Sequence, residues 1–126
     1  MVDKASKQIV CTFLGKGREH DFKVFKRSEC SFHEAMHLKA DKGYQGLKHI
    51  HANSQTPHRK PPKQTLRKEQ RATNRKLASE CITIEHVIGK LKVFRILQER
   101  YRNRRKRFGL RLNLIAGIYN HELGLP

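Results

Sequence analysis

The chain has 126 residues, the length of one domain, and its apolar content of 37% is low for a free-standing core of that size. Its 28 Lys and Arg residues against 11 Asp and Glu residues leave a formal net charge of +17, which favours a polyanionic partner: nucleic acid first, an acidic membrane surface second. No apolar run approaches the length of a membrane span and the basic segments lack an apolar helix face, so we expect no membrane association.

The first predicted element is a buried strand over residues 7–14. Its sequence, KQIVCTFL, holds five apolar or weakly polar residues between polar flanks and runs into the turn-forming GKG at residues 15–17. A short helix follows within HDFKVFKRS, residues 20–28, because its two phenylalanines are three residues apart. Either His20 or Asp21 is available to cap the first turn of this helix.

The next motif, HEAMH at residues 33–37, fits the pattern in which two histidines on a helix bind zinc and a glutamate acts as general base. The extended form of that motif requires a glycine and a third histidine, and the corresponding residues are Ala40 and Gly43. Eight histidines in so short a chain also make a chance match common. We therefore expect a histidine-bearing connector before a strand and no zinc-protease site.

A strand is predicted in MHLKAD, ending at Asp41, and the two glycines of KGYQG permit a tight turn directly after it. From about Gln45 to Gln64 the chain is polar and rich in histidine. Residues 51–64 within this stretch form a basic, proline-containing segment, which predicts an extended loop.

Two helices are predicted in the second half of the chain. The first begins at about Thr65, with basic residues over its first turns and an apolar stripe at spacings of three or four: Leu77, Cys81, Ile84, Ile88 and Leu91. The second runs from about Phe108 to Leu123, with Gly124 placed to end it and one apolar face: Leu112, Ile115, Tyr119 and Leu123.

Acidic residues on these elements form a candidate metal site. Glu85 and Lys92 are seven residues apart, so a helix places them on one stripe, while Asp41 stands at a predicted strand end. A strand-end aspartate with a helix-borne glutamate can hold magnesium, and two such ions can assist attack on a phosphodiester. Equally, Asp41 can be an ordinary turn residue, and Glu85 with Lys92 an ordinary solvated helix face.

Three segments carry a resemblance to a known family, in this order: GKGREHDFKVFKRS, ADKGYQG and NRKLASECITIEHVIGKLKVFRILQERYRNRRKRFGLRLNLIAGIYN. They resemble the C-terminal half of bacterial insertion-sequence transposases of the DDE type, within the insertion-sequence-five superfamily that is related to Harbinger transposases. The resemblance implies an α/β fold, the C-terminal part of a ribonuclease-H-like domain with long C-terminal helices. It also implies magnesium-dependent DNA cleavage at transposon ends and strand transfer into target DNA, with manganese as a substitute ion.

The resemblance assigns roles to three residues. Asp41 matches the second catalytic aspartate and Glu85 the catalytic glutamate, and both would be metal ligands. Lys92 matches a lysine that would contact DNA phosphate near the scissile site. The family's first aspartate lies on an earlier strand, so we expect residues 1–126 to be a single catalytic domain truncated at its N-terminus.

Asp3 and Asp21 match positions that are not catalytic in the family, and Asp21 is expected to cap a helix. Cys81 stands where the family pattern has an arginine, four residues before the glutamate. Two alternatives to an active enzyme follow: an inert DNA-binding remnant, or the downstream half of a frameshifted transposase. Either form is expected to associate with itself or with the upstream part of the transposase. An unrelated basic structural protein would require the order of the motifs to be coincidence.

The basic run RNRRKR, residues 102–107, is predicted to contact DNA phosphates without reading sequence, through Arg102, Arg104, Arg105 and Arg107. A solvated charge run is the alternative for this segment. Tyr44 and Tyr101 are predicted either to stack on unpaired bases or to pack on the core.

The three cysteines are odd in number, far apart and never in a CxxC pair, which is typical of a reduced compartment. The N-terminal sequence MVDKASKQIV has no apolar core like that of a signal peptide. We therefore expect a cytoplasmic protein that associates with the nucleoid.

Overall fold

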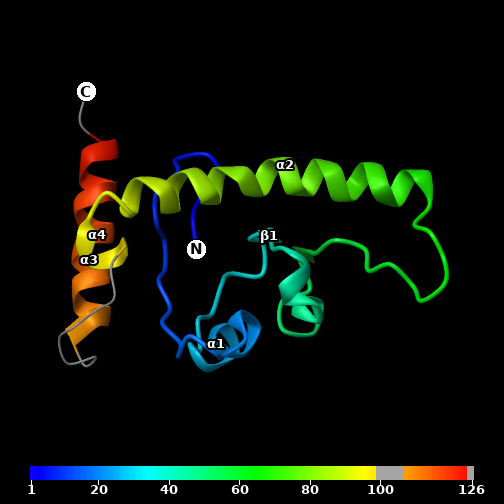
Figure 1. Cartoon of the computed structure of the whole chain (residues 1–126), viewed down its shortest axis with the longest axis horizontal. Coiled ribbons are helices and arrows are strands. Elements are labelled where there is room, and N and C mark those ends of the chain that lie inside the picture. Colours follow the sequence, from blue (N-terminus) through cyan, green and yellow to red (C-terminus); the bar gives the residue numbers. More distant parts are fainter. Residues whose placement is uncertain (99–106, 125–126) are drawn as a thin grey trace. The chain divides into compact units, whose positions relative to one another are not determined.

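A helix of 24 residues, α2 (Lys68–Leu91), is the longest helix in the structure, a computed structural model that describes residues 1–98 and 107–124 (Figure 1). The chain divides into two units within this helix. The middle unit consists of Gly15–Cys81, and the terminal unit combines Met1–Leu14 with Ile82–Pro126.

The middle unit begins with the short helix α1 (Asp21–Arg27), which confirms the helix predicted there. His20 is its N-cap, and its ring nitrogen Nδ1 accepts the N–H of Phe22 at 3.3 Å. Val24 and Phe25 are buried. Around them gathers an aromatic cluster of four rings with centroids 5.9–6.4 Å apart: Phe22, Phe25, Phe32 and Tyr44.

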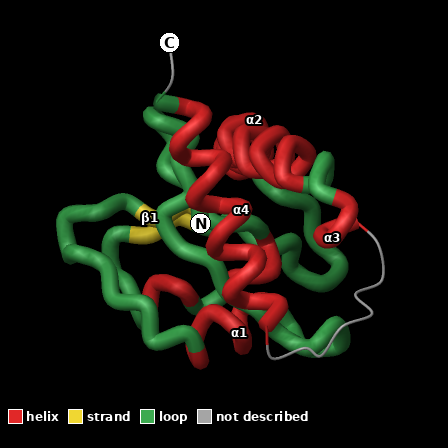
Figure 2. Tube along the Cα trace, turned by 90° about the vertical axis from the view of Figure 1, so that its left-hand side faces the viewer, coloured by secondary structure: helices red, strands yellow, loops and turns green. Residues whose placement is uncertain are grey.

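The sheet of the middle unit has two short parallel strands, β1 (Leu38–Lys39) and β2 (Ser54–Gln55), drawn in yellow in Figure 2. Leu38 pairs with Ser54, and the Ala40 N–H donates to the Gln55 carbonyl at 3.0 Å. The prediction of a strand ending at Asp41 was therefore wrong by two residues, and β2 lies in a stretch that was predicted to be loop. Two 3₁₀ helices, η1 (Lys42–Tyr44) and η2 (Leu47–His49), connect the strands.

The HEAMH segment is a turn that leads into β1, as expected of a connector. The Met36 N–H donates to the His33 carbonyl at 2.9 Å, so the two motif histidines do not share a helix. His37 is hydrogen-bonded to the Asn53 side chain at 2.7 Å, and the buried His51 ring bonds the Met36 carbonyl at 2.6 Å. The rings of His37 and His51 therefore hold the connector in place through hydrogen bonds.

Helix α2 begins at Lys68, three residues later than predicted, where the Gln70 side chain accepts the Arg67 N–H at 3.1 Å. Its predicted apolar stripe was only partly right. Leu77 is buried, but the second buried position is Val87, and Ile88 is 43% exposed. Leu77 and Val87 lie about 80° apart around the helix axis because each helical residue turns the chain by about 100°. A single straight apolar stripe is typical of a helix that packs against one partner. Leu77 and Val87 instead belong to different units, so their buried sides need not line up along α2.

The half-buried side chains of Lys39 and Glu80 form an ion pair that ties β1 to α2 within the middle unit. Leu38 of β1 and Ser54 of β2 are buried.

At the turn between η1 and η2, Gly46 adopts φ of 94°, a left-handed conformation that other residues rarely take.

The terminal unit contains α3 (Arg95–Gln98) and α4 (Phe108–Leu123). The bounds of α4 and its end at Gly124 agree with the prediction. Ile115 and Tyr119 of the predicted face are buried, together with Ala116, while Leu112 and Leu123 are half-buried.

The predicted buried strand over residues 7–14 was wrong. Only Ile9 makes a strand-like pair, an isolated antiparallel bridge to Val2, while Val10 is 57% exposed. The Asn120 side chain takes the place of a neighbouring strand. It accepts the Ile9 N–H at 2.7 Å and donates to the Ile9 carbonyl at 2.8 Å. A side-chain amide therefore satisfies backbone groups that the prediction had assigned to a sheet.

Candidate functional site

Asp41 lies in the turn after β1 and is exposed. It is the N-cap of η1, where its Oδ1 accepts the Gly43 N–H at 2.8 Å. This is the common geometry of an aspartate that begins a turn. The local structure of Asp41 therefore agrees with its interpretation as a turn residue. Its carboxylate is nonetheless open to solvent two residues beyond a strand, where a ligand can reach it.

Tyr44 follows Asp41 in η1 and packs by its ring edge on Phe22 and Phe25. Burial is the largest cause that raises the pKa of its hydroxyl, followed by the negative charges of Asp21 and Asp41. The ring contacts support the core-packing reading of Tyr44. Tyr101, the other tyrosine considered for base stacking, lies outside the described residues.

Glu85 and Lys92 are both exposed and lie near the C-terminal end of α2. The helix ends at Leu91, but the Lys92 N–H still donates to the Ile88 carbonyl at 3.0 Å, so both residues follow helical geometry. Between them, a Cβ added at Gly89 would meet nothing within 4 Å. Half-buried Cys81 precedes Glu85 by one turn of the same helix.

The carboxylates of Asp41 and Glu85 have the oxygen donors that magnesium prefers. They belong to different units, Asp41 to the middle unit and Glu85 to the terminal unit. Over residues 1–98 and 107–124, no three His, Cys, Asp or Glu side chains form a group able to hold a metal ion. Their joint use in one metal site stays a prediction.

Asp3 and Asp21 each take part in local structure, one in a turn and the other at the start of a helix. Asp3 accepts the backbone N–H and the hydroxyl of Ser6 at 2.7 and 2.6 Å, and these bonds lower the pKa of its carboxyl. Asp21 is the first residue of α1, so its negative charge lies at the favourable helix N-terminus, although His20 and not Asp21 is the cap.

Arg102, Arg104 and Arg105 of the predicted phosphate-contacting run lie outside the described residues. Arg107 is exposed and directly precedes α4. A second basic surface lies on the loop over residues 56–67 and on the first turns of α2. Its basic residues were noted from the sequence, but no binding role was assigned to them. Its signal was available in the sequence, because residues 57–76 hold eight Lys and Arg residues and a single acidic one, Glu69.

Residues 1–120 match the family model of the DDE superfamily endonucleases. The chain belongs to this family. It is also 52% identical over 125 residues to a protein of Microchaete diplosiphon named as a probable transposase for insertion sequence element IS702. The alignment covers 99% of the chain but 45% of that relative, so the chain spans about half the length of the relative it matches. No solved structure matches the chain.

Membership of the DDE superfamily endonucleases agrees with the resemblance drawn from the quoted segments. The mixture of helices and a small parallel sheet is compatible with the expected α/β class. None of the helices in the described part of the chain is both long and apolar enough to span a membrane.

Proposed function

We propose that this chain is part of a transposase that cuts DNA at the ends of a mobile element and joins them to target DNA. The observation that carries the proposal is the match of almost the whole chain to a probable transposase at 52% identity. The family model over residues 1–120 and the formal charge of +17 support it, since an endonuclease of DNA must bind a polyanion. In this proposal the two units are parts of a ribonuclease-H-like catalytic domain.

Asp41 and Glu85 are the proposed catalytic carboxylates. Superfamily members generally use divalent metal ions, and a bound magnesium ion would supply an activated nucleophile and charge neutralisation at the scissile phosphate. The residues of this chain would hold the ion and orient the DNA: Asp41 from the turn after β1, Glu85 from α2. Lys92 would bind DNA phosphate near the scissile site, and the arginines of residues 102–107 would contact DNA phosphates without reading sequence.

An inert DNA-binding remnant, or the downstream half of a split transposase, is the second candidate. The chain spans 45% of the relative's length, and Asp41 and Glu85 are two of the three carboxylates of the DDE pattern. In the split form, the polypeptide that corresponds to the rest of the relative would provide the first aspartate. We propose that it docks on the exposed apolar face of α4, which is formed by Leu110, Leu114 and Ile118.

The deciding experiment combines the chain with the segment of the IS702 relative that the alignment leaves uncovered, either as a fusion or as two polypeptides. Cleavage of duplex DNA carrying the element's ends is then measured with magnesium or manganese. We expect Asp41→Asn and Glu85→Gln to reduce cleavage to background while DNA binding persists, because each removes a metal-binding charge and keeps the side-chain shape.

Asp3→Asn and Asp21→Asn are the matched controls. They make the same change from carboxylate to amide at Asp3, which bonds to Ser6, and at Asp21, the first residue of α1. Undiminished cleavage by Asp41→Asn would disprove the catalytic assignment. DNA binding without cleavage by any combination, even in manganese, would establish the inert remnant.

A further inference from the structure

One side chain fixes the proline-containing loop to α2. The Oδ1 of Asn74 accepts the His58 N–H at 2.8 Å, and its Nδ2 donates to the His58 carbonyl at 3.1 Å. Both backbone groups of a single loop residue are thus paired with one amide, as they would be with a neighbouring strand. Because Asn74 lies near the start of a long helix, the loop is held against a rigid element.

This clamp ties together two segments of the middle unit that each carry cations. The loop contributes Arg59, Lys60 and Lys63, and the helix contributes Lys68, Arg71 and Arg75; all six are exposed. We call these six residues the clamp surface. None of them makes an ion pair within the described part of the chain. An uncompensated group of cations on a fixed frame favours an anionic ligand.

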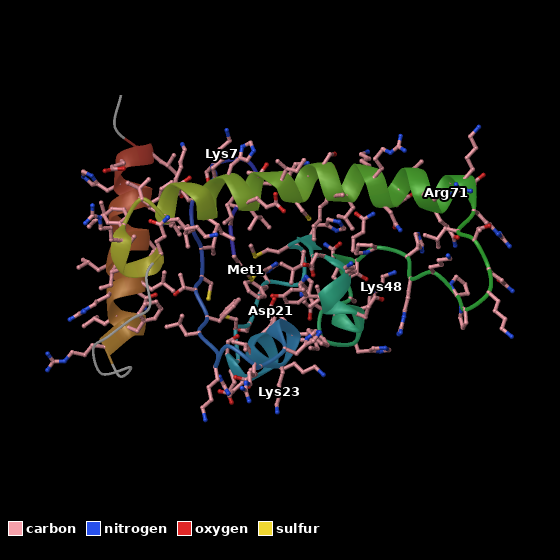
Figure 3. All side chains as sticks on the ribbon, in the orientation of Figure 1. Met1, Lys7, Asp21, Lys23, Lys48 and Arg71 are labelled. Carbon is pink, nitrogen blue, oxygen red and sulfur yellow. The ribbon has the colours of Figure 1, made fainter. Side chains whose placement is uncertain are left out.

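The helical half of the clamp surface has a definite direction. Lys68, Arg71 and Arg75 fall within about 60° of one another around the helix axis and span about 10 Å along it. The buried Leu77 marks the opposite side of the helix. The Nε of Arg71, a residue labelled in Figure 3, donates to the Leu66 carbonyl at 3.1 Å, and this bond orients the guanidinium.

We propose that the clamp surface binds the phosphate backbone of duplex DNA and that Asn74 preorganises it by holding the loop beside the helix. Residues 56–76 contain no Phe, Tyr or Trp, so this surface has no platform on which unpaired bases stack. It suits contacts to phosphates, which position a duplex without reading its sequence. The inference rests on the proposed function only in taking DNA as the substrate.

The test measures binding of the full chain to a labelled duplex that lacks any transposon sequence, between about 50 and 200 mM salt, where backbone binding weakens steeply. Asn74→Leu keeps the charge and the approximate size of the side chain but removes both bonds to His58. We expect about a fivefold to tenfold loss of affinity at low salt. The slope of log K against log salt should become shallower by about one, the value for one lost phosphate contact.

Charge removal provides a second variant that does not depend on the clamp. Arg59→Gln, Lys60→Gln and Lys63→Gln together should flatten the salt slope by about two or three, since each phosphate contact contributes about 0.9. The matched control removes the same charge elsewhere, through Lys7→Gln, Lys23→Gln and Lys48→Gln, at the exposed lysines labelled in Figure 3. This control should change the slope by less than half as much.

Equal losses from the two triple variants, or an unchanged slope for a folded Asn74→Leu chain, would overturn the proposal. So would equally clamp-dependent binding of single-stranded DNA, RNA or anionic vesicles. If Asn74→Leu does not fold, as judged by its circular dichroism and melting, the triple variants decide. This binding test is separate from the test of the proposed cleavage activity. Asp41→Asn with Glu85→Gln should abolish cleavage but leave the slope of log K against log salt unaltered.

Discussion

At the scale of single residues, Tyr44 links the aromatic core of the middle unit to the candidate catalytic aspartate. Its pKa is raised above the ordinary value of 10.0, chiefly by burial and then by the charges of Asp21 and Asp41. The folded state therefore holds the phenolic proton more tightly than the unfolded state does. The resulting stabilisation is fully present below about pH 10 and is lost as pH rises through the folded-state pKa.

We expect Asp41→Asn and Asp21→Asn each to lower the pKa of Tyr44 towards its ordinary value without restoring it fully, because burial remains the largest cause. Titration of the labelled tyrosine ring by NMR measures this pKa directly. Asp3→Asn is the control, since Asp3 does not contribute to the shift. An unaltered pKa in Asp41→Asn would mean that the carboxylate of Asp41 does not act on the Tyr44 hydroxyl.

Two asparagines do similar work in the two units, and neither was recognisable from the sequence. Asn74 pairs both backbone groups of His58, and Asn120 pairs both backbone groups of Ile9. Each asparagine lies inside a helix, where its type predicts only a mild loss of helix propensity. The partner is a distant segment, so the contact depends on tertiary structure that local patterns do not contain.

At the scale of elements, the approach of residue 15 to α1 is close enough to require glycine. A Cβ at Gly15 would lie 2.3 Å from Cγ2 of the buried Val24, whose β-branched side chain has little freedom to turn away. At Gly17, two residues later, an added Cβ would meet nothing within 4 Å. The two glycines thus provide a matched pair.

We expect Gly15→Ala to lower the free energy of unfolding by about 1–3 kcal/mol, the usual cost of overpacking. Gly17→Ala should change it by less than about 0.5 kcal/mol. Urea denaturation followed by circular dichroism measures both changes. Equal effects of the two substitutions would show that the contact between residue 15 and Val24 does not limit packing.

The helices were far more predictable than the strands, for a physical reason. The bounds of α4 follow from its apolar spacing and the glycine after it, and α1 follows from its paired phenylalanines, because these signals are local. Strands β1 and β2 have two residues each and are stabilised by pairing across a long connection. The catalytic assignment of Asp41 and Glu85 came from the family resemblance, since an exposed aspartate in a turn carries no chemical signature of its own.

At the scale of the whole molecule, α4 carries more apolar surface than its own unit covers. Ile115 and Tyr119 are buried, yet Leu110 is 71%, Leu114 64% and Ile118 41% exposed on another side of the same helix. A second copy of this chain carries the same charge of +17, so self-association through this face is opposed by repulsion. The uncovered part of the longer relative is the occupant we propose.

Leu114→Gln should weaken binding of that uncovered segment of the relative more than tenfold, because about 1.5–3 kcal/mol comes from burying one leucine side chain. Calorimetry with the purified segment measures the dissociation constant. Val93→Gln is the control, since Val93 is 80% exposed but does not lie on α4. A dimer of the chain alone that dissociates on Leu114→Gln, with no binding of the segment, would instead identify a second copy as the occupant. Equal binding by Leu114→Gln and Val93→Gln would show that the face of α4 is not the docking surface.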